Sequence, residues 1–199
     1  MSQLLESIKI RNGKALLLKQ HQSRIEKSFA QLNWGKTNIN LESFLAAIHL
    51  PSKGTWKCRI IYEKRIKSVQ IRPYRIKHTQ SLQVVEGDSI QYSLKTKDRK
   101  NLDRLFAERQ KAEDIIIIKN KLVTDAYYAN LLFLKEGKWY TPAQPLLQGV
   151  QRQILLEKKK IIPIDIPKKD IKTFEKIKLI NAMLDIKEGP EVEIDEVYF

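Results

Sequence analysis

The chain has 199 residues, of which 42% are hydrophobic and 30% are charged. This composition is ordinary for a globular protein with a sizeable core. No apolar run approaches the roughly 20 residues that span a bilayer, and the first residues lack the basic and apolar regions of a secretory signal. The single cysteine, Cys58, excludes an internal disulfide and is expected to be a small buried hydrophobe in a strand. We therefore expect a cytoplasmic protein with no membrane span.

The charge balance of the chain is strongly basic, with 37 Lys and Arg against 23 Asp and Glu and a net charge of +14. Such a charge can attract nucleic acid. The basic residues are, however, spread along the chain, and the densest run, Lys158–Lys160, follows a predicted helix. No helix-turn-helix, zinc-finger or aromatic RNA-binding motif is present. Surface charge and an anionic small substrate are therefore favoured over nucleic-acid binding.

The first half of the chain alternates between strand and helix patterns. Asn12-Gly13 is a strong signal for a β-hairpin. Ile25, Phe29 and Leu32 have the spacing of one helical face. The other elements expected here are a helix over 41–50, which Pro51 ends, and extended segments over 57–62, 66–71 and 75–85. These residues predict a small α+β domain over 1–88.

The second half of the chain begins with a more polar segment and continues as a larger domain, predicted over 89–199. Four consecutive isoleucines, Ile115–Ile118, indicate a buried strand at the start of a meander. Gly149 follows a proline-containing loop and directly precedes a helical pattern, which makes it a candidate anion-binding position. The other elements expected are helices over 101–112, 150–158 and 168–175 and strands over 122–124, 131–134, 161–166, 177–180 and 191–194.

The residue types available for chemistry exclude several classes of site. His21, His49 and His78 have no ligand-like spacing, so no metal site is expected. The nucleophile elbow of hydrolases and the glycine-rich nucleotide loops are absent. Lysine, arginine, aspartate, asparagine and backbone amides remain, and this set suits a lysine enzyme that holds a phosphorylated cofactor.

Six segments, in order along nearly the whole chain, resemble the class IV aminotransferase family. They are Leu5-Glu6-Ser7-Ile8, His21-x-x-Arg24, Lys95-Thr96-Lys97-Asp98-Arg99, Val123-Thr124-Asp125 with Asn130, Tyr140-Thr141-Pro142, and Leu147-Gln148-Gly149-Val150-Gln151-Arg152. The resemblance implies pyridoxal 5'-phosphate as cofactor and the two-domain fold of D-amino acid aminotransferases, with most cofactor contacts in the larger domain. Because the chain starts directly at the first of these segments, the resemblance also implies a truncated N-terminus.

The resemblance assigns Lys95 as the lysine that binds the cofactor covalently and acts in catalysis. Such a lysine must lose its proton near neutral pH, which burial or nearby positive charge favours. Lys97 would point to the same face of an extended chain, so local sequence does not decide between the two, and a surface lysine remains the alternative reading. Arg59 is a candidate for the substrate carboxylate, with a surface ion pair in the sheet as its alternative.

The remaining assignments concern the two ends of the cofactor. The resemblance implies that Arg24 and the backbone amides of Gly149, Val150 and Gln151 bind the phosphate, with a looser match at Asn181 and Ala182. Gln151 stands where the family usually has threonine. Asp125 stands where the family has a glutamate beside the pyridine nitrogen, and Asn130 is expected to orient the same region. Without the resemblance, Arg24 reads as a surface arginine and Asp125 as a turn residue.

The short length and the Lys95-to-Arg99 pattern are more similar to the lyase branch of the family than to the aminotransferases. The resemblance therefore implies a lyase like 4-amino-4-deoxychorismate lyase, which releases pyruvate from aminodeoxychorismate and leaves 4-aminobenzoate for folate synthesis. A branched-chain or D-amino acid aminotransferase and a non-catalytic relative that binds the cofactor or another anion remain the alternatives. The family also implies a homodimer.

Overall fold

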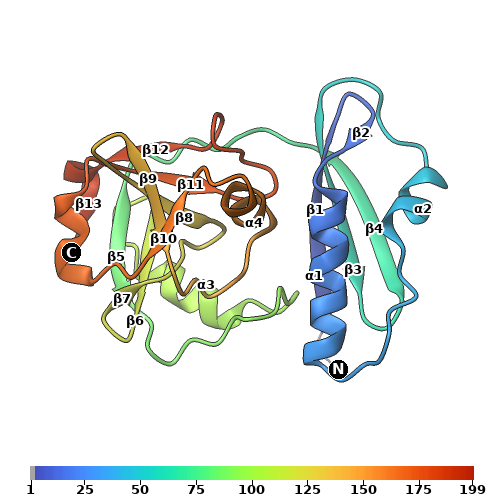
Figure 1. The fold of residues 1–199 in the computed structure, drawn as a ribbon, viewed down its shortest axis with the longest axis horizontal. Coiled ribbons are helices and arrows are strands. Elements are labelled where there is room, and N and C mark those ends of the chain that lie inside the picture. Colours follow the sequence, from blue (N-terminus) through green and yellow to red (C-terminus); the bar gives the residue numbers. More distant parts are fainter. Residues whose placement is uncertain (1–2) are drawn as a thin grey trace. The chain divides into compact units, whose positions relative to one another are not determined.

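The computed structural model describes residues 3–199, which form two compact units (Figure 1). The first unit contains the chain up to Ile76 together with Leu94–Asp98, and the second contains Lys77–Ser93 and Arg99–Phe199. The chain therefore crosses between the units three times. The sequence predicted a domain boundary at residue 88, which places strand β5 (Leu82–Glu86) in the first domain. In the structure β5 belongs to the second unit, because it pairs with β6 (Asp114–Lys119).

The first unit is a four-stranded antiparallel sheet with strand order β2-β1-β3-β4. The predicted hairpin at Asn12-Gly13 is confirmed, and both of its residues adopt the positive φ that this turn requires. Asn40 caps the second helix by accepting a hydrogen bond from the Ser43 amide at 2.9 Å. The elements are β1 (Leu4–Arg11), β2 (Lys14–Ala15), α1 (Leu18–Gln31), α2 (Leu41–Ala46), β3 (Thr55–Tyr62) and β4 (Ile66–Pro73).

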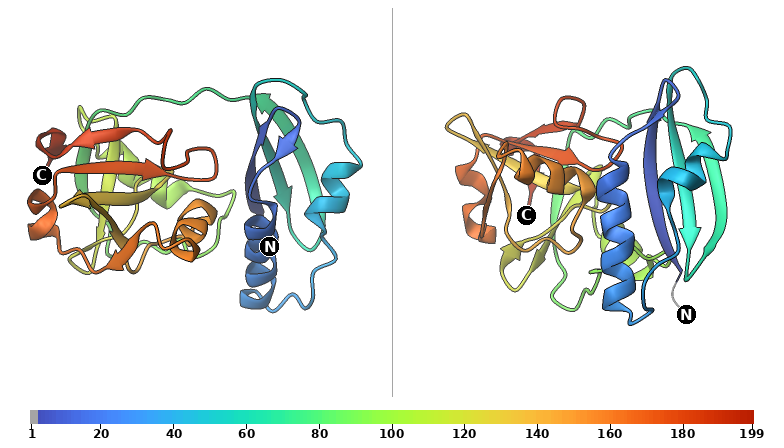
Figure 2. Two further views of the ribbon diagram at one scale, coloured as in Figure 1. Left: turned by 45° about the horizontal axis from the view of Figure 1, so that its top comes forward. Right: turned by 45° about the vertical axis from the view of Figure 1, so that its right-hand side comes forward.

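Helix α1 runs along the sheet of the first unit (Figure 2), and residues of both form the core of this unit. Ile25 and Phe29 pack from α1 against β1 and β3 residues that include Ile8, Cys58 and Ile60. The prediction of a buried, hydrophobe-like Cys58 is confirmed, since burial raises the pKa of its thiol to about 11. One side of β1 and β3 is thus committed to the core.

The second unit contains two mixed sheets, ordered β10-β9-β8-β11-β12 and β13-β5-β6-β7. Segment 75–81, expected to be extended, is not a strand, and the helix expected over 168–175 is a 3-10 helix. Besides β5 and β6, the elements are α3 (Lys100–Ala107), β7 (Leu122–Val123), β8 (Asn130–Lys135), β9 (Lys138–Pro142), α4 (Val150–Glu157), β10 (Ile162–Ile164), η1 (Lys168–Thr173), β11 (Lys176–Ile180), β12 (Glu191–Glu193), η2 (Ile194–Glu196) and β13 (Val197–Tyr198).

Strand β6 is buried on both faces, which explains its run of four isoleucines. Ile116 and Ile118 join the core that the two sheets share, while Ile115 and Ile117 pack against a cluster that includes residues of α3. Because successive side chains of a strand point to opposite faces, a continuous apolar run is what a strand covered on both sides requires. The start of the predicted meander is therefore a central, buried strand of the unit.

Candidate active site

In the first unit, the carboxylate of Glu6 joins two of the residues in the family-like segments. Glu6 lies on β1 and is fully buried, with its side chain on the face that packs against α1. Arg24, on α1, donates from Nε to Oε1 at 2.8 Å and from Nη2 to Oε2. His21, one turn earlier on α1, pairs through Nδ1 with Oε2 at 2.5 Å. A bidentate arginine–carboxylate pair of this kind fixes the guanidinium plane.

The electrostatics of this cluster favour an ionised Glu6 and a neutral His21. Burial alone would raise the pKa of Glu6, but the positive charge of Arg24 and the hydrogen bond with His21 outweigh it and lower the pKa to about 2. Burial lowers the pKa of His21, and the positive charges of Arg24 and Lys95 lower it further, against the opposing effect of Glu6. His21 Nε2 is buried, and no hydrogen-bond partner for it exists among residues 3–199.

Lys95 lies in the short segment that returns to the first unit beside β1. The Leu5 amide donates to the Lys95 carbonyl at 2.9 Å, and Leu4 forms a β-bridge with Thr96. Lys95 is half-buried, and its charge acts on His21. Lys97, the alternative left open by the sequence, is exposed and its Nζ is hydrogen-bonded to Gln3 Oε1 at 3.0 Å. Lys95 is thus the more buried of the two lysines, and its assignment as the reactive lysine stays a prediction.

The structure does not bring Arg59 together with the Glu6 cluster. In the register of β1 and β3, Glu6 is opposite Ile60, whereas Arg59 is opposite Ser7. Because adjacent residues of a strand point to opposite faces, Arg59 lies on the face of the sheet away from α1. Its assignment to a substrate carboxylate stays a prediction.

In the second unit, Asp125 and Asn130 form a buried hydrogen-bonded pair. Asn130 Nδ2 donates to Asp125 Oδ1 at 2.7 Å and to the Leu147 carbonyl at 2.9 Å, and the Leu147 amide donates to Asp125 Oδ2 at 2.9 Å. Asp125 is 4% exposed and Asn130 is 5% exposed. Asn130 thus orients Asp125 and ties it to the loop before α4, while the role of Asn130 in cofactor binding stays a prediction.

Burial raises the pKa of Asp125 to about 7, although the hydrogen bonds from the Leu147 amide and Asn130 and the charge of Arg152 oppose this change. Burial makes the ionised form of a carboxyl group unfavourable. Such a group therefore either keeps its proton or is stabilised by a neighbouring positive charge, such as a protonated ring nitrogen. The assignment of Asp125 to the cofactor ring nitrogen stays a prediction.

Gly149 is required for the close approach of α4 to Asn130. A Cβ at Gly149 would lie 2.0 Å from Asn130 Oδ1, so no other residue fits without moving that side chain. Gly149 precedes α4, and within the described part of the chain no side chain caps this helix. The first amides of an uncapped helix, here those of Val150 and Gln151, can bind an anion.

Two further residues have roles that the sequence did not reveal. Arg152 is 4% exposed and donates to Thr141 Oγ1 at 3.2 Å, to the Pro142 carbonyl at 2.8 Å and to Gln148 Oε1 at 3.0 Å. It fixes the start of α4 to the end of β9. The sequence pointed to Arg152 only through its position at the end of a family-like segment.

Glu6 could have been noticed in the sequence as a charged residue between the apolar residues Leu4 and Ile8 on the inner face of β1.

Asn181 and Arg99 hold the turn that joins Asp125 to Asn130. Asn181 Nδ2 donates to the Tyr128 carbonyl at 3.2 Å, and its Oδ1 accepts from the Met183 and Leu184 amides at 2.8 and 3.1 Å. Arg99 Nη2 donates to the Tyr127 carbonyl at 2.5 Å. The Asn181 side chain is thus used to fix two turns, and Ala182, beside it, is half-buried. A phosphate contact at these two residues stays a prediction.

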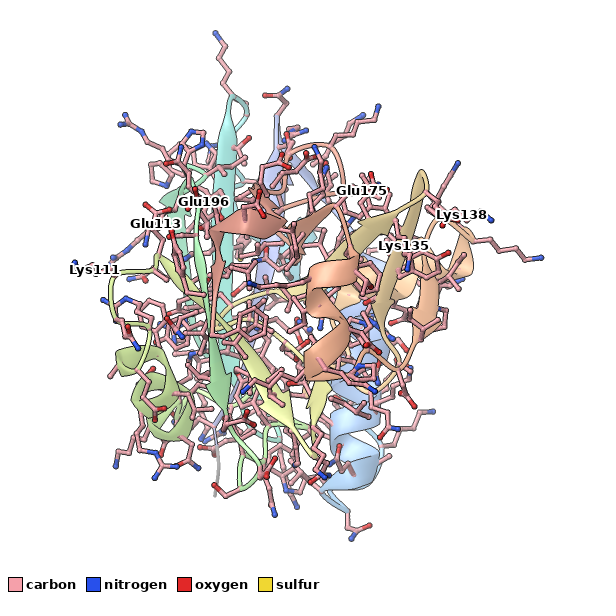
Figure 3. All side chains as sticks on the ribbon, turned by 90° about the vertical axis from the view of Figure 1, so that its left-hand side faces the viewer. Lys111, Glu113, Lys135, Lys138, Glu175 and Glu196 are labelled. Carbon is pink, nitrogen blue, oxygen red and sulfur yellow. The ribbon has the colours of Figure 1, made fainter. Side chains whose placement is uncertain are left out.

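Charged groups on the surface of the second unit are mixed in sign. Figure 3 labels Lys111, Glu113, Lys135, Lys138, Glu175 and Glu196 on the face turned to the viewer. No helix among the described residues is long and apolar enough to cross a membrane. Within residues 3–199 there is also no group of three metal-ligating side chains.

The Glu6 cluster of the first unit and the Asp125–Asn130 pair of the second unit both lie in segments that resemble the class IV aminotransferase family. The sequence profile described as "Amino-transferase class IV" matches residues 3–188. The chain belongs to the class IV aminotransferase family.

Individual relatives agree with this membership. An uncharacterized protein of Haemophilus influenzae is 40% identical over 186 residues, which cover 92% of this chain and 98% of the relative. A crystal structure from Haemophilus somnus, provisionally named a 4-amino-4-deoxychorismate lyase, is 37% identical, covers 94% of this chain and 98% of its own, and has a TM-score of 0.88. The PLP-bound form of a hypothetical aminotransferase from Mycobacterium tuberculosis is 18% identical, with a TM-score of 0.76 and coverage of 96% and 80%, which shows a shared fold. The predicted family and the predicted α+β fold of D-amino acid aminotransferase type are confirmed.

Proposed function

We propose that this chain is a pyridoxal phosphate-dependent lyase that converts aminodeoxychorismate to 4-aminobenzoate and pyruvate. The observation that carries the proposal is the 37% identity, over 94% of the chain, to the Haemophilus somnus protein provisionally named for this activity. Support also comes from a Schizosaccharomyces pombe protein with a similar provisional name, 31% identical over 94 residues. The second candidate is an aminotransferase that acts on a branched-chain or D-amino acid, because the family is described by the name aminotransferase.

The residues present fit pyridoxal phosphate. Asp125, buried and with its pKa raised to about 7, suits a protonated ring nitrogen. The amides of Gly149, Val150 and Gln151 stand at the start of a helix with no side-chain cap in the described chain, which suits a phosphate. Arg24, which Glu6 holds in place, is likewise proposed as a positively charged contact for a phosphate.

Each side chain then has a defined task. Bound pyridoxal phosphate would supply a sink for the electron pair released at the substrate carbon that bears the amine. Lys95 would hold the cofactor and then take the proton from that carbon. Asn130 and the Leu147 amide hold Asp125 in place, and Arg59 is proposed for a substrate carboxylate. The bond between the pyruvyl oxygen and the ring breaks as the ring becomes aromatic, and pyruvate leaves.

Pyruvate release without a keto-acid acceptor separates the two candidate reactions. Purified protein with pyridoxal phosphate and aminodeoxychorismate is expected to form 4-aminobenzoate and pyruvate in equal amounts. Product that appears only when a keto acid is added would support the aminotransferase instead. Failure to bind pyridoxal phosphate at all would indicate a non-catalytic relative.

The oligomeric state and the partners form part of the same proposal. We propose a homodimer that acts on a small anionic amino substrate, since the net charge of +14 favours such a ligand. The mass of the purified protein in solution is the check on the dimer.

A further inference from the structure

His21 has one ring nitrogen whose hydrogen-bonding capacity is unused. The ring is 0% exposed, and Nδ1 pairs with Glu6 Oε2 at 2.5 Å. Nε2 is buried, and the described chain offers it no hydrogen-bond partner. An unsatisfied buried polar atom costs on the order of 1–3 kcal/mol. Such an atom calls for a functional explanation when the rest of its cluster is fully bonded.

The tautomer of His21 follows from its partner. Glu6 is ionised at neutral pH because its pKa is about 2, so both of its oxygens accept hydrogen bonds. The hydrogen of a neutral His21 must therefore be on Nδ1, and Nε2 carries a lone pair. Arg24 offers only donors, and its two hydrogen bonds to Glu6 hold it at the carboxylate. Nε2 is thus a base that Glu6 orients.

Several charged and titratable groups act within the Glu6–His21 cluster. Glu6 on β1 and Arg24 on α1 form the cluster, and Tyr62 on β3 has its own pKa raised by burial and by Glu6. Lys95, in the segment beside β1, is the remaining cation that acts on His21. Of these groups, Lys95 is the one that must lose a proton in the proposed function, because its ammonium group has to become a neutral amine before it reacts.

We propose that His21, oriented by Glu6, accepts the proton of the Lys95 ammonium when that amine has to react. The Nζ–H bond of Lys95 breaks, a bond between this hydrogen and His21 Nε2 forms, and Nζ keeps the electron pair as a nucleophile. The carboxylate of Glu6 offsets the charge of the imidazolium, as in other carboxylate–histidine pairs. The inference rests on the proposed function, because that function makes Lys95 the reactive lysine.

The tautomer provides the first test, and it needs no cofactor. In ¹⁵N spectra of the protein without pyridoxal phosphate, His21 is expected to be neutral at neutral pH, with its hydrogen on Nδ1. The variant Glu6→Gln is expected to lose this preference, since an amide can either donate or accept. A His21 that carries its hydrogen on Nε2 in the unsubstituted protein would overturn the inference.

The second test is the rate at which Lys95 forms its covalent adduct with pyridoxal phosphate, followed by absorbance and trapped with borohydride. His21→Gln is expected to slow the rate about 100-fold, the scale of general-base catalysis, and Glu6→Gln is expected to slow it as well. His49→Gln, at an exposed position of the same unit, is the matched control and should leave the rate unchanged. Circular dichroism checks that each variant is folded.

The pH profile separates proton transfer from a merely structural role. The pKa of His21 lies below its ordinary value of 6.5, so the rate should fall as pH decreases through that range and protonates Nε2. His21→Gln should lack this limb of the profile. Equal rates and equal profiles in folded His21→Gln would overturn the inference alone. Absence of any adduct on Lys95 in the unsubstituted protein would overturn the proposed function together with it.

Discussion

At the scale of single residues, Asp125 determines how the protein without cofactor should respond to pH. Its folded pKa of about 7 is raised above the ordinary value of 3.8 by burial. A carboxyl with a raised pKa contributes stability that is fully present below 3.8 and is lost as pH rises through 7. The free energy of unfolding is therefore expected to decrease by about 3 kcal/mol between about pH 5 and about pH 8.

Urea titrations at the two pH values measure this loss. The variant Asp125→Asn should lose less unfolding free energy between these pH values, because the amide does not titrate. Pyridoxal phosphate should also reduce this loss, if a protonated ring nitrogen lies beside the carboxylate and favours its ionised form. An unchanged pH dependence in Asp125→Asn would show that Asp125 titrates normally.

Local sequence identified some of these residues but not their connections. Asp125, Asn130 and Gly149 could be assigned because each occupies its place in a family-like segment. The hydrogen bond from Asn130 to the Leu147 carbonyl joins residues 17 positions apart, and the pair of Glu6 with Arg24 joins residues 18 apart. Contacts of this kind depend on how strands and helices pack, which side-chain spacing along one segment does not encode.

At the scale of elements, the start of α4 depends on Gly149. In Gly149→Ala, the new Cβ would meet Asn130 Oδ1 at 2.0 Å, so Asn130 must move and give up its bonds to Asp125 and Leu147. Since buried groups then lose their partners, we expect a destabilisation of about 2 kcal/mol and weaker binding of pyridoxal phosphate.

Thermal unfolding and a pyridoxal phosphate titration test this expectation. Gln144→Ala, at an exposed position of the same loop, is the control and should behave as the unsubstituted protein. If Gly149→Ala kept both the melting temperature and the affinity, the approach of α4 to Asn130 would not matter for the site.

The elements themselves followed their sequence patterns where one physical cause dominated. Asn12-Gly13 made the hairpin, and the four isoleucines of β6 made a strand buried on both faces. The pattern was less informative for residues 75–81, which were expected to be extended but which no neighbouring strand pairs with in the described chain. Strand propensity is realised only where a pairing partner exists.

At the scale of the whole molecule, the assigned residues come from both compact units. Lys95 and Arg24 belong to the first, and Asp125 and Gly149 belong to the second. Lys95 and Lys97 both belong to the first unit, in the segment Leu94–Asp98, and they could not be distinguished by sequence alone. The backbones of both lysines are hydrogen-bonded to residues in or beside β1, but Lys95 is half-buried whereas Lys97 is exposed and its Nζ donates to Gln3 Oε1.

The most direct test of the central claim is to locate the lysine that reacts with the cofactor. The protein is incubated with pyridoxal phosphate, reduced with borohydride, digested and analysed by mass spectrometry. The account predicts a phosphopyridoxyl group on Lys95, which is lost in Lys95→Ala and kept in Lys97→Ala. An adduct on Lys97 or on another lysine, with Lys95 unmodified, would contradict it.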